Sequence, residues 1–185
     1  MAQLGKAQKN QLTRLKKEFE RLQKQLQGIH KKTGYEDLAH AHAQTADMPA
    51  LAGAMKQGGY VIVFRHGATN RDQADTDPLN FDNTTKQRLL SEQGKRVATQ
   101  VGDAFKKLGI PLGKVYTSKF NRAVETVKLM SGGDVTPTLD VTEGGLVVTP
   151  IENDRRAEAL KKMAGTVPEA GKNTLIVTHR PNIMR

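Results

Sequence analysis

Short apolar runs and amphipathic stretches alternate along the chain from residue 50 onward. Runs rich in β-branched and other apolar residues predict strands at residues 61–64, 115–117, 135–139 and 173–178. Apolar positions at helical spacing, bounded by Gly or Pro, predict helices at residues 50–57, 91–108, 121–130 and 153–164. Because such alternation is typical of a parallel sheet covered by helices, we predict an α/β fold. The expected architecture is a three-layer sandwich with a mostly parallel central sheet flanked by helices.

Residues 1–48 follow a different pattern, with apolar side chains on one helical stripe among charged and amide residues. The stripe consists of Leu12, Leu15, Phe19, Leu22, Leu26 and Ile29. It predicts an amphipathic helix that packs on the domain or self-associates through residues 12–29. The alternatives are a loosely ordered extension, or a segment that binds a membrane surface or nucleic acid. We therefore divide the chain into an N-terminal helix and linker, 1–48, and an α/β domain, 49–185.

Composition and charge exclude some kinds of site and favour anionic ligands. The chain has 185 residues and no Cys, which excludes disulfides and Cys-ligated metal centres. Its formal net charge is +10, of which residues 1–48 supply +4 (9 Lys/Arg, 5 Asp/Glu) and residues 49–185 supply +6 (20 Lys/Arg, 14 Asp/Glu). This excess suits anionic ligands without choosing among them. Because no bilayer-spanning apolar run and no secretory signal is seen, we expect a cytoplasmic protein, or a periplasmic one if the natural N-terminus differs.

Polar, reactive residues follow three of the predicted strands. Arg65 and His66 follow the first, Ser118 and then Arg122 follow the second, and His179 follows the last. Because the carboxyl ends of parallel strands lie at one edge of the sheet, these side chains can converge although they are far apart in sequence. Guanidinium groups bind phosphoryl oxygens in a bidentate way, and a neutral imidazole can attack phosphorus. The pattern therefore indicates a site for a tetrahedral oxyanion.

Four motifs in this part of the chain resemble those of the histidine phosphatase superfamily, which includes phosphoglycerate mutases. Residues 65–69, RHGAT, match the family signature R-H-G-x-T, and residues 90–94, LSEQG, resemble L-[ST]-x-x-G. Residues 118–126, SKFNRAVET, resemble S-P-x-x-R-A-x-x-T, with Lys119 in place of the usual proline. His179, at the end of the last predicted strand, resembles the second histidine of the family. The order and context of the motifs indicate a small, bacterial-type member.

The resemblance implies a phosphoryl transfer that needs neither a metal nor a cofactor. His66 would be the nucleophile that takes the phosphoryl group, and Arg65, Arg122 and His179 would hold its oxygens in the transition state. Water would then hydrolyse the phosphohistidine. The candidates for substrate binding around this centre are Gly67, Thr69, Ser118 and Arg180.

Three assignments remain open from the sequence. Ser118 either hydrogen-bonds beside the phosphate or caps the helix that follows it. Arg180 either adds a cation to the anion site or points into solvent. A general acid must protonate the leaving oxygen. In the family it is a carboxylate after the second arginine's helix, which makes Glu143 the first candidate and Glu152 the second, with an Asp of the loop 72–82 as the third.

We expect a phosphatase that hydrolyses phosphate monoesters, carried by a small molecule or a phosphoprotein. The small size and the lack of a large cap insertion favour a phosphatase over a mutase, and nucleic acid is not an expected partner. The chain ends soon after His179, where members of the family usually continue, so we expect a C-terminally truncated domain. The alternatives are a catalytically impaired domain that binds phosphate or phosphoproteins, and an interaction module driven by the N-terminal helix.

Overall fold

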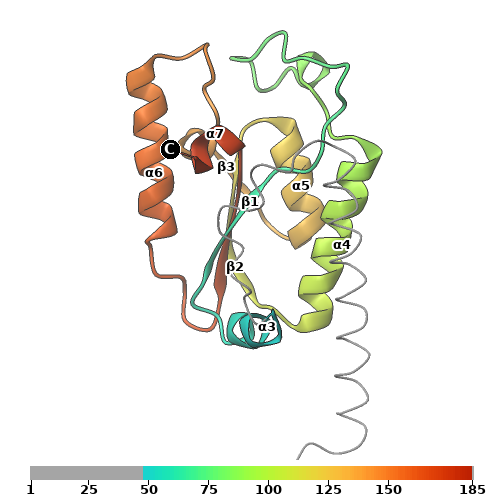
Figure 1. The fold of residues 1–185 in the computed structure, drawn as a ribbon, viewed down its shortest axis with the longest axis vertical. Coiled ribbons are helices and arrows are strands. Elements are labelled where there is room, and N and C mark those ends of the chain that lie inside the picture. The colour runs from blue at the N-terminus through green and yellow to red at the C-terminus, as the bar shows by residue number, and fades with distance from the viewer. Residues whose placement is uncertain (1–47, 185) are drawn as a thin grey trace, which may run out of the picture. The chain divides into compact units, whose positions relative to one another are not determined.

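A four-stranded parallel sheet forms the centre of the computed structural model, which describes residues 48–184 (Figure 1). The strand order is β1-β4-β2-β3, and every neighbouring pair is parallel. The strands are β1 (Val61–Arg65), β2 (Leu112–Ser118), β3 (Thr136–Thr138) and β4 (Asn173–Thr178). The parallel sheet confirms the predicted α/β class. The predicted N-terminal helix and most of its linker lie outside the described residues.

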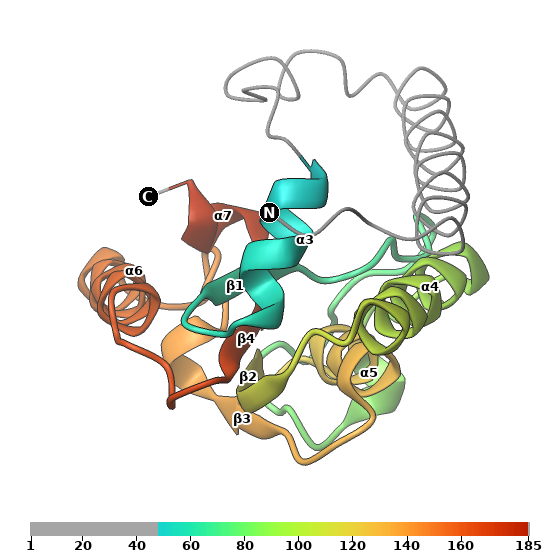
Figure 2. The ribbon, with the colours of Figure 1, turned by 90° about the horizontal axis from the view of Figure 1, so that it is seen from below.

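Helices connect the strands and cover both faces of the sheet. They are α3 (Met48–Lys56), α4 (Glu92–Leu108), α5 (Asn121–Ser131), α6 (Pro150–Ala164) and α7 (Arg180–Ile183), with the short 3₁₀ helices η1 (Thr84–Lys86) and η2 (Leu139–Val141). Helices α4 and α5 lie on one face and α6 lies on the other (Figure 2). Among residues 48–184, no helix is both long and apolar enough to cross a membrane.

Strand β4 supplies apolar side chains to both sides of the sheet. Leu175 and Val177 belong to one core cluster, with Phe105 of α4 and Val127 of α5. Ile176, which lies between them in the strand, belongs to a second cluster with residues of α6 and η2. Because successive side chains of a strand point to opposite faces, the central strand holds the two helical layers together. The predicted three-layer arrangement is therefore confirmed.

Strand β1 lies at an edge of the sheet and is only partly buried. Within the described chain it pairs with β4 alone, and the side chain of Val63 is 37% exposed. All six residues of β4, by contrast, are buried. A continuous apolar run is typical of a strand covered on both faces, but it does not reveal whether the strand has one neighbour or two. The apolar run 61–64 therefore predicts the strand but not its position in the sheet.

Capping residues set the helix boundaries. Helix α4 begins after Ser91, whose Oγ accepts a hydrogen bond from Gly94 N at 3.1 Å, as the predicted start requires. Helix α6 begins at Pro150, three residues before the predicted start at 153. Thr149 caps it by accepting from Glu152 N at 3.2 Å. The sequence T-P-I-E contains both a capping-box pattern and a first-turn proline, so this start could have been predicted.

The strand register brings the carboxyl ends of β1, β2 and β4 to one edge of the sheet. Arg65 of β1 lies opposite Thr178 of β4, and Thr117 of β2 lies opposite Val177. The loop that follows β1 packs closely against the start of α4. A Cβ added to Gly94 would lie only 2.2 Å from the carbonyl oxygen of Ala68. A side chain at this position would force the loop and the helix apart.

Candidate active site

Two histidines meet where β1 and β4 end. His66 follows β1 and is 7% exposed, and His179 follows β4 and is 0% exposed. The centroids of their rings are 4.9 Å apart, with the ring planes at 63°. The backbone N–H of His66 donates to Thr178 O at 3.0 Å, which extends the pairing of the two strands to the site itself. The structure thus brings together the two histidines that the sequence placed at different strand ends.

A contact with the backbone decides the tautomer of His66. Its Nδ1 lies 2.8 Å from Gly67 O. Because a carbonyl oxygen only accepts, Nδ1 carries the proton and Nε2 keeps its lone pair. Burial, followed by the positive charges around the ring, lowers the pKa of His66 from 6.5 to about 3, against the opposing effect of the Gly67 hydrogen bond. The imidazole is therefore neutral near pH 7, which is the state that can attack phosphorus.

Both ring nitrogens of His179 face polar partners. Nε2 lies 2.7 Å from Ser118 Oγ, which also accepts a hydrogen bond from Phe120 N at 3.2 Å. Nδ1 lies 3.2 Å from Oε1 of Glu143, without a hydrogen bond of acceptable geometry. Burial lowers the pKa of His179, while the negative charge of Glu143 opposes this shift. A neutral ring with its proton on Nδ1, accepting at Nε2 from the Ser118 hydroxyl, satisfies these contacts.

Ser118 thus contacts the second histidine, and its alternative role as a helix cap is wrong. The N-cap of α5 is Phe120, which has no capping side-chain hydrogen bond. The side chain of Ser118 is 0% exposed, and its Oγ closes a short turn at the end of β2 instead. Its position therefore fixes the orientation of the His179 ring.

Arg122 lies at the centre of an ion-pair cluster. Its side chain is 0% exposed, with Nη1 at 2.9 Å from Asp75 Oδ1 and Nη2 at 2.6 Å from Glu143 Oε1. Its guanidinium carbon lies 4.1 Å from the centroid of the Phe120 ring. A buried guanidinium requires such partners, because an uncompensated buried charge is strongly destabilising. Two carboxylates from different loops thus meet at one arginine.

Glu143 places one oxygen between two groups that we predicted to hold phosphate. Its Oε1 contacts both Arg122 Nη2, at 2.6 Å, and His179 Nδ1, at 3.2 Å. Burial alone would raise the pKa of Glu143. The contact with His179 Nδ1, together with the hydrogen bond and the charge of Arg122, outweighs burial and lowers this pKa from 4.5 to about 2. An anionic oxygen of the protein itself therefore lies at the point where Arg122 and His179 converge.

Gly67 and Thr69 have structural contacts beside His66. The N–H of Gly67 donates to Thr126 Oγ1 at 3.0 Å, and a Cβ on Gly67 would lie 3.0 Å from Gly94 O. Thr69 forms an isolated antiparallel bridge with Leu90. These contacts hold the loop after β1 against α4 and α5. The substrate-binding roles of Gly67 and Thr69 stay predictions.

The two predicted cations at the strand ends, Arg65 and Arg180, are exposed. The charge of Arg65 still contributes to lowering the pKa of His66, so it lies near the site. Arg180 is the first residue of α7. Glu152, the second candidate for the general acid, lies in α6, where it pairs with Arg155 and Arg156 at 2.8 Å each. These positions favour Glu143 over Glu152 as the acid.

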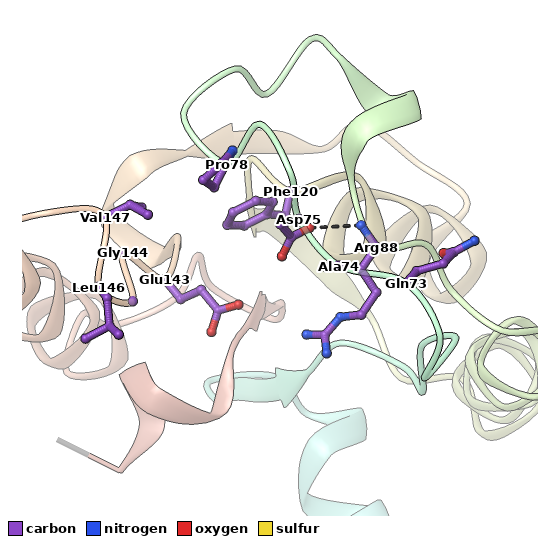
Figure 3. A pocket seen from close by; sticks show the side chains of 11 residues that line it. Gln73, Ala74, Asp75, Pro78, Arg88, Phe120, Glu143, Gly144, Leu146 and Val147 are labelled. Atoms are coloured by element: carbon purple, nitrogen blue, oxygen red, sulfur yellow. Dashed lines mark hydrogen bonds between the residues drawn. The ribbon is translucent and has the colours of Figure 1, made fainter.

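The loop between β1 and α4 contributes Asp75, which belongs to the loop aspartates that the sequence offered as the third candidate for the general acid, and Arg88, which the sequence did not single out. Asp75 Oδ1 accepts from Arg88 N as well as from Arg122 Nη1, both at 2.9 Å. A pocket of about 360 Å³ opens at this loop (Figure 3). Its lining consists of Gln73, Ala74, Asp75, Pro78, Arg88, Phe120, Glu143, Gly144, Gly145, Leu146 and Val147. Within residues 48–184, no group of three or more potential metal ligands gathers.

Comparisons with known proteins match the part of the chain that carries His66, Arg122 and Glu143. The family model of the histidine phosphatase superfamily (branch 1) matches residues 61–143, which contain three of the four sequence motifs, and it confirms the resemblance there; His179 lies outside the match. A search of curated proteins finds no match. Among solved structures, the chain is similar to the protein histidine phosphatase SixA complexed with tungstate (20% identity, covering 66% of this chain and 70% of that chain, TM-score 0.45).

Two further solved structures with similarity to the chain are phosphatases. One is a mycobacterial glucosyl-3-phosphoglycerate phosphatase complexed with VO3 (18% identity, 68% of this chain and 78% of that chain, TM-score 0.47). The other is a phosphoserine phosphatase mutant from Entamoeba histolytica in complex with phosphoserine (17% identity, 66% of this chain and 75% of that chain, TM-score 0.44).

Proposed function

Because residues 61–143 belong to the histidine phosphatase superfamily, we propose that this protein is a metal-independent phosphatase that acts through a phosphohistidine on His66. The observation that carries the proposal is the state of His66, a buried neutral imidazole whose Nε2 keeps its lone pair. Arg122 and His179 lie beside it as donors for phosphoryl oxygens. The substrate is a phosphate monoester, carried by a small molecule or by a phosphoprotein.

Substrate binding begins with an exchange of anions at Arg122 and His179. A phosphoryl oxygen takes the place of Glu143 Oε1, and accepts hydrogen bonds from Arg122 Nη2 and His179 Nδ1. Arg65 adds positive charge at the exposed side of the site. The cost of moving Glu143 is offset because a phosphate dianion brings more negative charge to the same donors. The donors are already in place, as electrostatic stabilisation of a transition state requires.

The displaced Glu143 then becomes a proton donor. Away from Arg122 and His179 it loses the contacts that lower its pKa, while burial, which raises the pKa, still acts on it. As the bond from His66 Nε2 to phosphorus forms and the bond from phosphorus to the ester oxygen breaks, Glu143 protonates the leaving oxygen. In the second step Glu143 takes a proton from water, the water oxygen bonds to phosphorus, and the bond to Nε2 breaks.

An assay of turnover and of the intermediate tests the proposed function. The 185-residue protein should hydrolyse 4-nitrophenyl phosphate in the presence of EDTA. Rapid quenching with ³²P-labelled substrate should trap a label that is stable in base and lost in acid, as a phosphoramidate is. A well-folded protein, checked by circular dichroism, that binds phosphate without turnover would support the impaired binding domain instead.

Glu143→Gln tests the general acid. The variant keeps the size of the side chain but cannot donate a carboxyl proton, so hydrolysis should slow most for esters with a poor leaving group. We expect kcat to fall about 100-fold or more for phenyl phosphate and clearly less for 4-nitrophenyl phosphate. Glu152→Gln is the matched control, and it should leave both rates unchanged. A loss in Glu152→Gln but not in Glu143→Gln would reverse the assignment.

A further inference from the structure

One arginine that lines the pocket has no anionic partner among the described residues. Arg88 lies in the lining together with Asp75 and Glu143, and the side chains of Arg88 and Glu143 extend toward the same space (Figure 3). Both carboxylates form ion pairs with Arg122, and among the described residues neither forms one with the guanidinium of Arg88. The Nε of Arg88 is shielded from solvent and has no hydrogen-bond partner. Because an unpaired buried donor of a charged group is costly, this guanidinium is suited to an anionic group of a ligand.

The backbone around Arg88 is fixed before any ligand binds. Its N–H donates to Asp75 Oδ1 at 2.9 Å, and the N–H of Leu89 donates to Gln73 Oε1 at 2.9 Å. The preceding residue, Gln87, is buried. A side chain that projects from such a rigid segment loses less conformational freedom on binding than one on a mobile loop. Arg88 is thus held in place at one side of the pocket.

The remaining lining of the pocket indicates which other part of the ligand it can hold. Pro78, Phe120, Leu146 and Val147 give it an apolar lining, and its volume of about 360 Å³ suits a small organic group. Phe120 also contacts the guanidinium of Arg122, so the pocket adjoins the site proposed for the phosphoryl group. The two histidines are not part of its lining. The pocket therefore receives the portion of a substrate that lies beyond the transferred phosphoryl group.

We propose that Arg88 is a specificity residue that binds a second anionic group, carried by the leaving group of the substrate. The proposal rests on the phosphatase function proposed above. It restricts the substrate class to phosphate monoesters whose leaving group combines an apolar body with an anionic substituent. The guanidinium of Arg88 binds this substituent, and the apolar walls of the pocket contact the body.

Paired aryl phosphates that differ only in one charge test this inference. The carboxyphenyl phosphates, with the carboxylate at the 3 or the 4 position, are compared with the corresponding neutral carboxamides. For the wild-type protein, kcat/KM should be about tenfold higher for a carboxylate than for its carboxamide, mainly through KM. Arg88→Gln should remove this preference, and Arg88→Lys should keep part of it. Arg96→Gln, which removes an exposed arginine of α4 outside the pocket lining, is the matched control and should keep the preference.

A binding measurement separates this inference from the proposed catalysis. Carboxybenzyl phosphonates and their carboxamides cannot be hydrolysed, so calorimetric titration reports the same preference even if the protein has no turnover. A wild-type protein that binds charged and neutral compounds equally would overturn the proposal. An equal loss of affinity for the charged and the neutral compound in Arg88→Gln would overturn it as well. Arg88 would then contact the phosphoryl group or only support the fold.

Discussion

Replacement of His66 by alanine is expected to lower kcat for 4-nitrophenyl phosphate by about 10⁴-fold or more, because the variant has no atom that can take the phosphoryl group. The base-stable phosphoenzyme should disappear with it. The loss should not come from unfolding, because His66 donates one side-chain hydrogen bond, to Gly67 O, and removal of its small ring leaves the core clusters intact. Activity and circular dichroism of the same preparation check this.

Controls separate the loss of the nucleophile from a loss of geometry. His66→Asn keeps a donor near Gly67 O but provides no imidazole, so it should be as inactive as His66→Ala. Lys119→Ala, which changes an exposed residue beside Ser118, should retain activity. Full turnover by His66→Ala would disprove the nucleophile, and turnover without a trapped phosphoenzyme in the wild type would indicate direct attack by water.

The burial of neutral His66 also predicts a pH dependence. Its pKa is about 3 in the folded protein and 6.5 in the unfolded chain, so the unfolded chain binds more protons between these values. This contribution to stability is fully present above pH 6.5 and is lost as the pH falls toward 3. His66→Ala should therefore lose less stability than the wild type on acidification, and urea denaturation at a series of pH values measures the difference. As a nucleophile, His66 stays unprotonated well below pH 6.5.

The sequence predicted the elements of the domain well because their signals are local. The apolar run that ends at Arg65, the cap at Ser91 and the run before His179 each lie within one element. The alternation of strands and helices predicts a parallel sheet, and in such a sheet the carboxyl ends of the strands share one edge. This prediction requires no knowledge of side-chain contacts. The position of β1 at the sheet edge could not be predicted in this way, because it depends on pairing between strands that are distant in sequence.

The contacts between side chains in the site could not be predicted for the same reason. Asp75 is 47 residues from Arg122, and the loop that carries it contains several other Asp residues with the same local signal. The sequence around Arg88 does not distinguish it from any other cation before a helix, and only its shielded Nε and its place in the pocket single it out. Glu143 could be proposed from the family resemblance, but its direct contact with Arg122 and His179 is a product of the fold.

Replacement of Arg122 by methionine is expected to reduce both activity and stability. Methionine has a similar length but no charge, so the donor for a phosphoryl oxygen is lost, and kcat/KM should fall about 100-fold or more. The carboxylates of Asp75 and Glu143, whose side chains are about 19% and 20% exposed, would lose their common partner. Breaking a buried ion pair typically costs about 3–5 kcal/mol. Because these carboxylates are partly exposed, we expect the free energy of unfolding to fall by about 3 kcal/mol.

Arg155 provides a matched control at the surface. It also binds two carboxylates, those of Asp140 and Glu152, at 2.8 Å each, but its side chain is 48% exposed. Arg155→Met should therefore change the free energy of unfolding by only about 1 kcal/mol or less, because exposed ion pairs contribute little. Urea denaturation compares the two variants directly. Equal losses would show that burial does not set the energy of the Arg122 cluster.

The pH dependence of the Arg122 variant identifies the carboxylate responsible. Glu143 has a pKa of about 2 in the folded protein against 4.5 in the unfolded chain, so its contribution to stability is present above pH 4.5 and is lost as the pH falls toward 2. Without Arg122, burial of Glu143 dominates, and its pKa should rise. Arg122→Met should then gain stability relative to the wild type as the pH falls, and Arg122→Met combined with Glu143→Gln should show less of this gain. A constant difference between wild type and Arg122→Met at every pH would mean that Glu143 is not coupled to Arg122, and that phosphate need not displace it to bind.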